Sequence, residues 1–173
     1  MKECITKKTK LSRILELGNN CSKCGHCCKH TSGFILKEEA GKIAKYLNMD
    51  EKEFIDKCLK PVVMFNTVAF KPLTARKKNK YYGNCIFYDL ELGCSIQSVK
   101  PLHCKISNCN EYGDELNAWF SLNYFVNEDD PESLRQWNTY LKSGGKGITG
   151  GSFAELVPDL RIRMKLLNYE VLR

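Results

Sequence analysis

The amino-acid sequence predicts an α+β fold: a small, mostly helical single domain with a short β-hairpin and irregular loops organised by a metal. Three observations lead to this prediction. Several segments repeat apolar residues at helical spacing, a stretch near the middle is rich in β-branched and aromatic residues, and ten cysteines lie mainly in loop-like sequence. Because 173 residues is about the length of one ordinary domain, we expect residues 1–173 to form a single domain.

The first half of the chain contains three segments with the pattern of short amphipathic helices. Residues 9–17 place leucine and isoleucine on one side of a helix that Gly18 ends, and residues 37–47 repeat apolar residues every three to four positions. Asp50 is expected to cap a third helix, and Glu53 stands where it would complete an acidic capping box.

Strands are expected in the middle of the chain. Pro61 should end the third helix, because proline removes a backbone donor and clashes with the preceding turn. Residues 62–65 and 67–70 are β-branched and aromatic, and a further β segment near 81–88 would add to a small hairpin-like sheet. Residues 94–109 carry cysteines too densely for an ordinary core and are expected to wrap a metal.

The last third is expected to form a C-terminal helical cap over residues 131–173. Pro131 begins one helix, and the glycine-rich residues 144–151 end it. This loop lacks the residue order of a phosphate-binding loop, so a flexible connector is favoured over an anion site.

A final helix is expected to begin at the capping box formed by Ser152 and Glu155, and Pro158 should shift its start or kink it. Its apolar residues share one face and should pack on the core: Phe153, Leu156, Val157, Leu160, Met164, Leu167 and Val171.

Composition narrows the class of protein. The mean hydropathy is −0.38 and no apolar run approaches the ~20 residues of a spanning helix, so no membrane association is expected. The N-terminus has charge but no apolar segment behind it, which predicts a cytoplasmic protein without a secretory signal. The formal charge is +7, but metal-bound thiolates would offset part of it. The basic residues in 71–80 are interpreted as a solvated loop, so nucleic acid is not the expected partner.

The cysteines form two clusters. The first reads C-x2-C-x2-C-C and contains Gly25, which permits the tight turn that brings two sulfurs to one metal. Its adjacent Cys27 and Cys28 are expected to project in different directions, so one of them could serve a second site. The second cluster has the spacings C-x8-C, C-x9-C and C-x4-C. The candidate metal ligands are Cys21, Cys24, Cys27, Cys28, Cys85, Cys94, Cys104 and Cys109.

The two remaining cysteines are not expected to bind the metal. Cys4 is near the N-terminus, and Cys58 lies on the apolar side of the third helix, as a buried core thiol would. Eight clustered thiols suffice for two four-thiolate sites, or for one site with spare thiols. Disulfides are the alternative, and the cytoplasmic location disfavours them.

A series of blocks, in this order, resembles the CxxCxxCC or YkgJ-like cysteine-cluster family of zinc- or iron-chelating domains: Cys21-Ser22-Lys23-Cys24-Gly25-His26-Cys27-Cys28, Glu38-Glu39-Ala40, Ile43-Ala44, Asn84-Cys85-Ile86-Phe87-Tyr88, Gly93-Cys94-Ser95-Ile96 and Lys100-Pro101-Leu102-His103-Cys104-Lys105. The resemblance covers the cysteine-rich region at about residues 20–110. It implies metal binding through the cysteines. Ile86, Gln97, Lys100 and Lys105 depart from the family's usual residues, which include an arginine before and after the proline–cysteine block.

Iron and zinc both suit thiolates. No histidine stands in a Cys2His2 pattern, and His26, His30 and His103 are expected to support the ligands rather than bind the metal. An all-sulfur site with much of the chain left to shield it favours an iron–sulfur cluster, preferably [4Fe–4S], with zinc as the alternative.

Two classes of function follow. The first is an electron-transfer or accessory module for a protein partner or redox enzyme. The second is an iron–sulfur-dependent enzyme, either an oxidoreductase or a macromolecule-modifying enzyme; relatives in the resembled family are labelled iron–sulfur oxidoreductases, and a similar block accompanies lysine methylation of flagellin. The sequence contains no hydrolase triad, dinucleotide fingerprint or C-x3-C-x2-C motif, so the first class is preferred and no catalytic residue is assigned.

Overall fold

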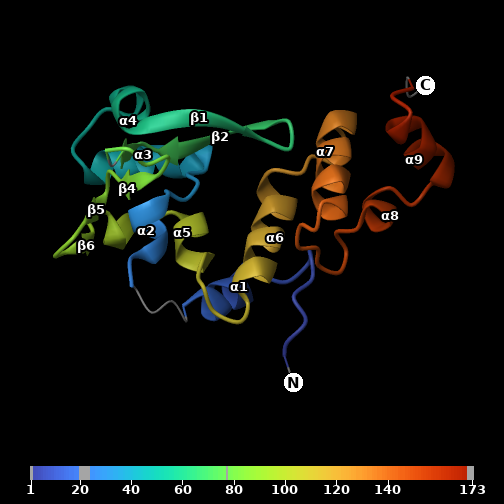
Figure 1. Cartoon of the computed structure of the whole chain (residues 1–173), viewed down its shortest axis with the longest axis horizontal. Coiled ribbons are helices and arrows are strands. Elements are labelled where there is room, and N and C mark those ends of the chain that lie inside the picture. Colours follow the sequence, from blue (N-terminus) through green and yellow to red (C-terminus); the bar gives the residue numbers. More distant parts are fainter. Residues whose placement is uncertain (1, 20–23, 77, 171–173) are drawn as a thin grey trace.

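The computed structural model describes residues 2–19, 24–76 and 78–170, and Figure 1 shows their arrangement. The described helices are α1 (Leu11–Gly18), α2 (His26–His30), α3 (Lys37–Tyr46), α4 (Glu51–Cys58), α5 (Leu102–Ile106), α6 (Gly113–Tyr124), α7 (Pro131–Lys142), α8 (Phe153–Leu156) and α9 (Leu160–Leu167), with a 3-10 turn η1 (Gln97–Val99). The strands are β1 (Leu59–Met64), β2 (Thr67–Pro72), β3 (Thr74–Arg76), β4 (Gly83–Cys85), β5 (Tyr88–Asp89) and β6 (Gly93–Cys94). The predicted α+β class, mostly helical with short β-hairpins, is confirmed.

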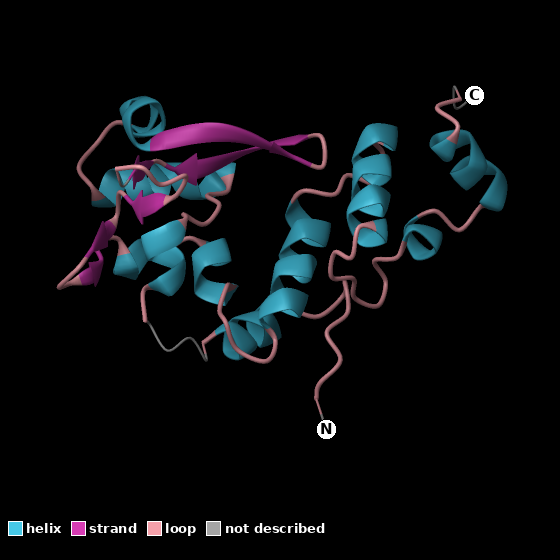
Figure 2. Cartoon of the chain, viewed as in Figure 1, coloured by secondary structure: helices cyan, strands magenta, loops and turns pink. Residues whose placement is uncertain are grey.

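Strands and helices gather at different ends of the molecule. Figure 2 shows every strand at one end together with α2–α5, and α6–α9 at the other. The segment expected to form the C-terminal cap contains α7–α9, which lie at the same end as α6 (Figure 1). None of the helices in the described ranges is both long and apolar enough to cross a membrane.

The predicted central hairpin is confirmed. β1 and β2 pair antiparallel, with Met64 opposite Thr67. Phe65 and Asn66 have φ angles of 49° and 60°, the left-handed values of a two-residue hairpin turn. The segment expected near 81–88 differs: its residues belong to β4 and β5, which pair with β3 and β6 in two separate two-stranded sheets.

The predicted helix starts are mostly correct, with two local differences at α4. Asp50 caps α4, because its carboxylate accepts hydrogen bonds from the amides of Lys52 and Glu53 at 2.9 and 3.3 Å. The Glu53 side chain does not return to the cap; it accepts from Lys57 Nζ, one turn later, at 2.7 Å. The helix also ends at Cys58, ahead of Pro61, which is the third residue of β1.

Two apolar clusters form the core. The larger one packs α1, α6 and α7 together, with Ile14, Leu116 and Trp137 completely buried. The smaller one lies under α3 and α4, where Ile43 and Phe54 are completely buried. Helix α6 was not predicted, although it is among the most buried parts of the described chain. Its buried residues include Ala118, Trp119 and Phe120 in succession, which hides any helical periodicity.

The C-terminal cap is as predicted, and the expected helix is divided in two at Pro158. Ser152 and Glu155 form the expected capping box at 3.0–3.2 Å. The helix stops after Leu156, and a new helix, α9, begins beyond Pro158. As a result, the expected core-facing residues Leu160 and Met164 are 63% and 49% exposed, and Leu166 is buried instead. Val171 lies outside the described residues.

The N-terminal segment crosses to the other end of the chain. Thr6 forms a parallel bridge with Thr149, and the Lys7 amide donates to the Thr149 carbonyl at 2.9 Å. Trp119 Nε1 donates to the Thr9 carbonyl at 3.1 Å, and Trp137 Nε1 donates to the Gly151 carbonyl at 2.7 Å. The glycine-rich loop, expected to be a flexible connector, is therefore hydrogen-bonded to both the N-terminal segment and α7.

Candidate metal centre

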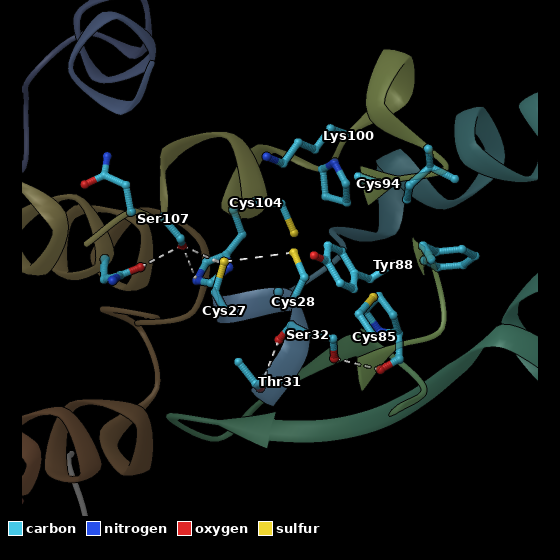
Figure 3. A pocket seen from close by; sticks show the side chains of 18 of the residues that line it. Cys27, Cys28, Thr31, Ser32, Cys85, Tyr88, Cys94, Lys100, Cys104 and Ser107 are labelled. Atoms are coloured by element: carbon cyan, nitrogen blue, oxygen red, sulfur yellow. Dashed lines mark hydrogen bonds between the residues drawn. The ribbon is translucent and has the colours of Figure 1, made fainter. Parts of the chain in front are cut away.

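Six cysteines line one cavity of ≈ 270 Å³, which we call the cysteine cavity (Figure 3). They come from four elements and one loop: Cys27 and Cys28 from α2, Cys85 from β4, Cys94 from β6, Cys104 from α5 and Cys109 from the loop after α5. The two clusters that are far apart in sequence therefore meet in space. Each contributing element is only two to five residues long, so the cavity depends on contacts between elements rather than on any one of them.

The turn before α2 depends on Gly25. Gly25 has φ = 70°, a left-handed conformation that glycine adopts without strain. A side-chain carbon there would collide with the hydroxyl of Tyr88, which also lines the cavity. The chain then enters α2, so Cys27 and Cys28 lie on a short helix rather than in the expected loop.

The sulfurs of Cys27 and Cys28 do not diverge as expected. Their Sγ atoms are 4.0 Å apart (Figure 3). Two thiolates bound to one tetrahedral zinc at about 2.3 Å would have sulfurs about 3.8 Å apart. The spacing therefore fits two ligands of one metal centre with a small adjustment, although the residues are adjacent in sequence.

Short hydrogen-bonded turns hold the strands that carry Cys85 and Cys94. The amide after Cys85, that of Ile86, donates to the Leu73 carbonyl at 3.0 Å. In the β5–β6 hairpin, Asp89 Oδ1 accepts from the amides of Glu91 and Leu92, both at 2.8 Å, and this closes the turn before Gly93 and Cys94. The two strand ends are thereby brought to the same side of the cavity.

Glu39 positions α5, which carries Cys104. One carboxylate oxygen accepts from the Leu36 amide at 2.9 Å and caps α3, and the other accepts from the Leu102 amide at 2.7 Å at the start of α5. On the opposite side, Gly33 lies so close to Cys104 Sγ that a side-chain carbon would collide with the sulfur. The Cys104 thiol is thus fixed between α3, α5 and the segment after α2.

Burial and neighbouring groups shift the pKa values of the cavity thiols in different directions. Burial raises the pKa of Cys104 to about 12, and it also raises the pKa of Cys85. The hydrogen bond with Cys28 lowers the pKa of Cys27 to about 6 against the opposing effect of burial, and the Lys100 ammonium contributes to the lowering. The pKa of Cys28, as the partner that holds the proton, is raised. A metal must displace these protons, since thiolates are the binding form.

His103 lies in the cavity lining as a neutral ring. Burial, together with nearby Lys71, lowers the pKa of His103 to about 4. Its Nδ1 accepts a hydrogen bond from the Phe34 amide at 3.3 Å, and the ring packs edge-to-face against Phe34 and Phe120. A histidine fixed in this way forms part of the cavity wall. His26 and His30 lie outside the lining, with their rings 4.5 Å apart on α2.

Cys24 and Cys21 complete the predicted ligand set. Cys24 is exposed and does not line the cavity, and Cys21 lies outside the described residues. Of the two cysteines set aside, Cys4 is exposed and its sulfur lies 3.7 Å from Thr149 Oγ1. Cys58 does not line the cavity; it packs against the smaller apolar cluster and is partly buried rather than fully buried as predicted.

Sequence analysis missed several residues of the cavity wall. Ser107 donates a hydrogen bond to Asn117 Oδ1 at 2.9 Å, and both residues line the cavity. Asn117 belongs to α6, which was not predicted. The sequence around Gly33 contains no pattern that indicates its role, because the atom it lies against is the sulfur of Cys104, about 70 residues later.

The donor set fits a thiophilic metal, although its geometry is open. Among the residues that the structure describes, the lining holds six thiols and no carboxylate, which matches zinc or an iron–sulfur cluster and not magnesium or calcium. Within the described ranges, no three histidine, cysteine or acidic side chains already converge at metal-binding distances. The thiols therefore need to close around the metal.

Comparisons with known proteins agree with this chemistry. No curated protein and no solved structure matches the chain in the corresponding searches. A family model described as "CxxCxxCC: Putative zinc- or iron-chelating domain" matches residues 20–127. The match spans every cavity cysteine and continues through α6, which supplies Asn117. The chain therefore belongs to the CxxCxxCC family of zinc- or iron-chelating domains.

Proposed function

We propose that this chain holds an iron–sulfur cluster, preferably [4Fe–4S], and serves as an electron-transfer or accessory module for a protein partner. The single observation that carries the proposal is the meeting of six cysteines from both sequence clusters in one cavity. One zinc ion takes four ligands in a structural site. A cavity with six thiols and a volume of ≈ 270 Å³ offers more thiol and more space than one ion requires.

An accessory role is favoured because the described lining is poor in groups for acid–base chemistry. It contains no carboxylate. His103 stays neutral at ordinary pH, and its Nδ1 already accepts from a backbone amide. If four thiolates hold each metal centre, its coordination is closed, as in structural and electron-transfer sites.

Anaerobic purification tests the identity of the metal. We expect iron with a comparable amount of acid-labile sulfide, a brown colour and broad charge-transfer absorption that bleaches on reduction. Added cyanide or imidazole should leave the spectrum unchanged if the coordination is closed. Colourless protein with stoichiometric zinc and no sulfide would show that the site binds zinc rather than an iron–sulfur cluster. Spectral changes on adding small ligands would favour the alternative function, an iron–sulfur-dependent enzyme.

Matched cysteine variants test the location of the site. Cys104→Ala removes a thiol fixed in the cavity wall, so the purified protein should lose most of its metal. Cys58→Ala removes a thiol that packs on the smaller apolar cluster and does not line the cavity, so metal content should stay unchanged. Loss of metal in the folded Cys58→Ala protein alone would place the site elsewhere.

A further inference from the structure

Helix α9 presents an unusually apolar surface to solvent. Leu160, Met164 and Leu167 follow one another at helical spacing and are 63%, 49% and 38% exposed. We call these three side chains the α9 stripe. Ile162 and Tyr169, nearby, are also exposed. Single exposed apolar residues are common, but a continuous patch marks a contact surface.

The orientation of α9 is fixed from its other side. Leu166 is buried against the larger apolar cluster. Arg135 on α7 donates from Nη1 to the Leu166 carbonyl at 3.1 Å, and its guanidinium lies 4.3 Å from the centre of the Tyr169 ring. Because Leu166 faces the core, the α9 stripe faces away from it. The stripe cannot be buried by a simple rotation of the helix without exposing Leu166.

A groove of ≈ 240 Å³ lies directly beside α9. Its floor is apolar and includes Leu134 of α7 as well as Ile162 and Leu166 of α9 itself. Three carboxylates line it: Glu128, Asp129 and Asp159. We call this feature the acidic groove. Glu128 forms an ion pair with Lys7, and Asp159 caps α9, so Asp129 is the carboxylate best placed to attract a new positive charge.

The charge of α9 is complementary to that of the groove. Between its first and last residues α9 contains Arg161, Arg163 and Lys165 and no acidic residue. A basic helix with an exposed apolar stripe thus lies next to an apolar groove with an acidic rim. The groove includes Ile162 and Leu166 of α9, which lie on the other side of the helix from the stripe. Stripe and groove are therefore separate parts of this end of the molecule, and together they supply both halves of a complementary pair.

We propose that this end of the molecule joins two copies of the chain in a two-fold symmetric dimer, with α9 of each copy lying against the acidic groove of the other. In a two-fold interface the same patch meets itself, and each contact occurs twice. The α9 stripe would be covered, and Arg161 would approach Asp129 of the partner subunit. The net charge of +7 opposes self-association in general, so the local pairing of opposite charges is what makes this end of the molecule suitable.

Sedimentation velocity and light scattering over a micromolar to millimolar concentration range test the dimer. We expect the anaerobically purified full chain to dimerise, and Met164→Asp to weaken dimerisation on the order of a hundredfold, because a charge is buried twice. Val63→Asp, at an exposed hairpin position, is the control and should dimerise normally. Circular dichroism melts establish that both variants are folded. A wild-type monomer throughout, or a Met164→Asp dimer, would overturn the proposal.

A charge-reversal pair tests the predicted arrangement. In a homodimer of the Asp129→Lys variant, both contacts join two positive charges. In a homodimer of the Arg161→Glu variant, both contacts join two negative charges. Each variant alone should dimerise on the order of tenfold more weakly. Mixing the two should restore dimers, because each contact of the mixed dimer again joins opposite charges. Failure of the mixture to dimerise better than either variant would refute the arrangement. Binding of a monomer to anionic vesicles through α9 would overturn the dimer and show that the stripe contacts a membrane surface instead.

Discussion

At the scale of single residues, Gly33 leaves no space for a side chain beside the cysteine cavity. An added Cβ would collide with Cys104 Sγ. We expect Gly33→Ala to displace that sulfur and to lower the metal content of the purified protein severalfold. Gly147→Ala is a suitable control, because the new carbon would lie 3.2 Å from the flexible end of Leu141. Metal and sulfide analysis checks the outcome; full metal content in Gly33→Ala would show that the Cys104 sulfur has room to move.

Lys100 should influence how tightly protons compete with the metal. Its ammonium lowers the pKa values of Cys27 and Cys104. In Lys100→Gln these thiols hold their protons more strongly, so the pH at which half of the metal is released should rise, by less than one unit. The exposed Lys105, which does not line the cavity, supplies the control Lys105→Gln. Titration of metal release against pH measures the shift, and a midpoint equal to that of the control would contradict the prediction.

The spacing of the cysteines predicted the composition of the site better than its geometry. Both cysteine clusters meet in the cavity, as the motif implied, and Cys58 stays outside it. The contact between Gly33 and Cys104, and the contribution of Asn117, depend on which elements pack together. A single sequence does not contain that information. The approach of the Cys27 and Cys28 sulfurs was not predicted, and it occurs on the short helix α2, where a loop was expected.

At the scale of elements, the segments with clear caps and one apolar face were predicted well. Asp50 and Pro131 mark the starts of α4 and α7 correctly. Helix α6 escaped prediction because its buried residues are nearly consecutive, and a helix enclosed on most sides has no polar face to reveal its period. For the α9 stripe, periodicity predicted burial that the structure does not show. Its periodicity is real, but the break at Pro158 turns those residues toward solvent.

The cap of α4 gives a direct test of an element's start. Asp50 satisfies two amides at the first turn of a helix only eight residues long. Asp50→Ala should lower the free energy of unfolding by about 1 kcal/mol, the usual effect of losing a side-chain cap. Asp56→Ala, within the same helix, should be neutral or slightly stabilising, because alanine has the higher helix propensity. Chemical denaturation of both variants provides the comparison, and equal stabilities would show that Asp50 contributes nothing as a cap.

At the scale of the whole molecule, metal removal should affect the two ends differently. The cavity elements α2, β4, β5, β6 and α5 have two to five residues each, too few to be stable alone. The larger apolar cluster gives the longer helices α6 and α7 extensive packing of their own, including Trp119 and Trp137. After chelation or cluster oxidation, residues 24–36 and 83–112 should be cleaved first by a protease, while α6 and α7 persist. Mass spectrometry of the fragments checks this order, and uniform protection would mean that the metal is not structural.

Acid should weaken the contact between the N-terminal segment and the glycine-rich loop. Burial would raise the pKa of Glu115, but hydrogen bonds from Lys2 and Lys146 outweigh it and lower the pKa from 4.5 to about 2. A lowered carboxyl pKa stabilises the fold above pH 4.5, and this contribution is lost as the pH falls toward 2.

Glu115→Gln should therefore melt at a lower temperature than wild type at pH 6, and the difference should shrink between about pH 4.5 and pH 2 as the wild-type carboxyl protonates. Thermal melts of both proteins across this range give the measurement. Because both lose metal equally in acid, the difference between their melting temperatures isolates the carboxylate. A difference that stays constant with pH would assign the effect to packing rather than to charge.

The bridge between Thr6 and Thr149 has a consequence for how the protein is made. The two residues are 143 positions apart, by their numbers in the sequence. A ribosome adding 5–20 residues per second needs about 7 to 30 s to synthesise the intervening chain. During that interval Thr6 lacks its bridge partner, whereas every candidate ligand, up to Cys109, is made well before Thr149. Cofactor insertion can thus precede completion of the chain, and closure of the N-terminal segment onto the glycine-rich loop is expected to be a late event in biogenesis.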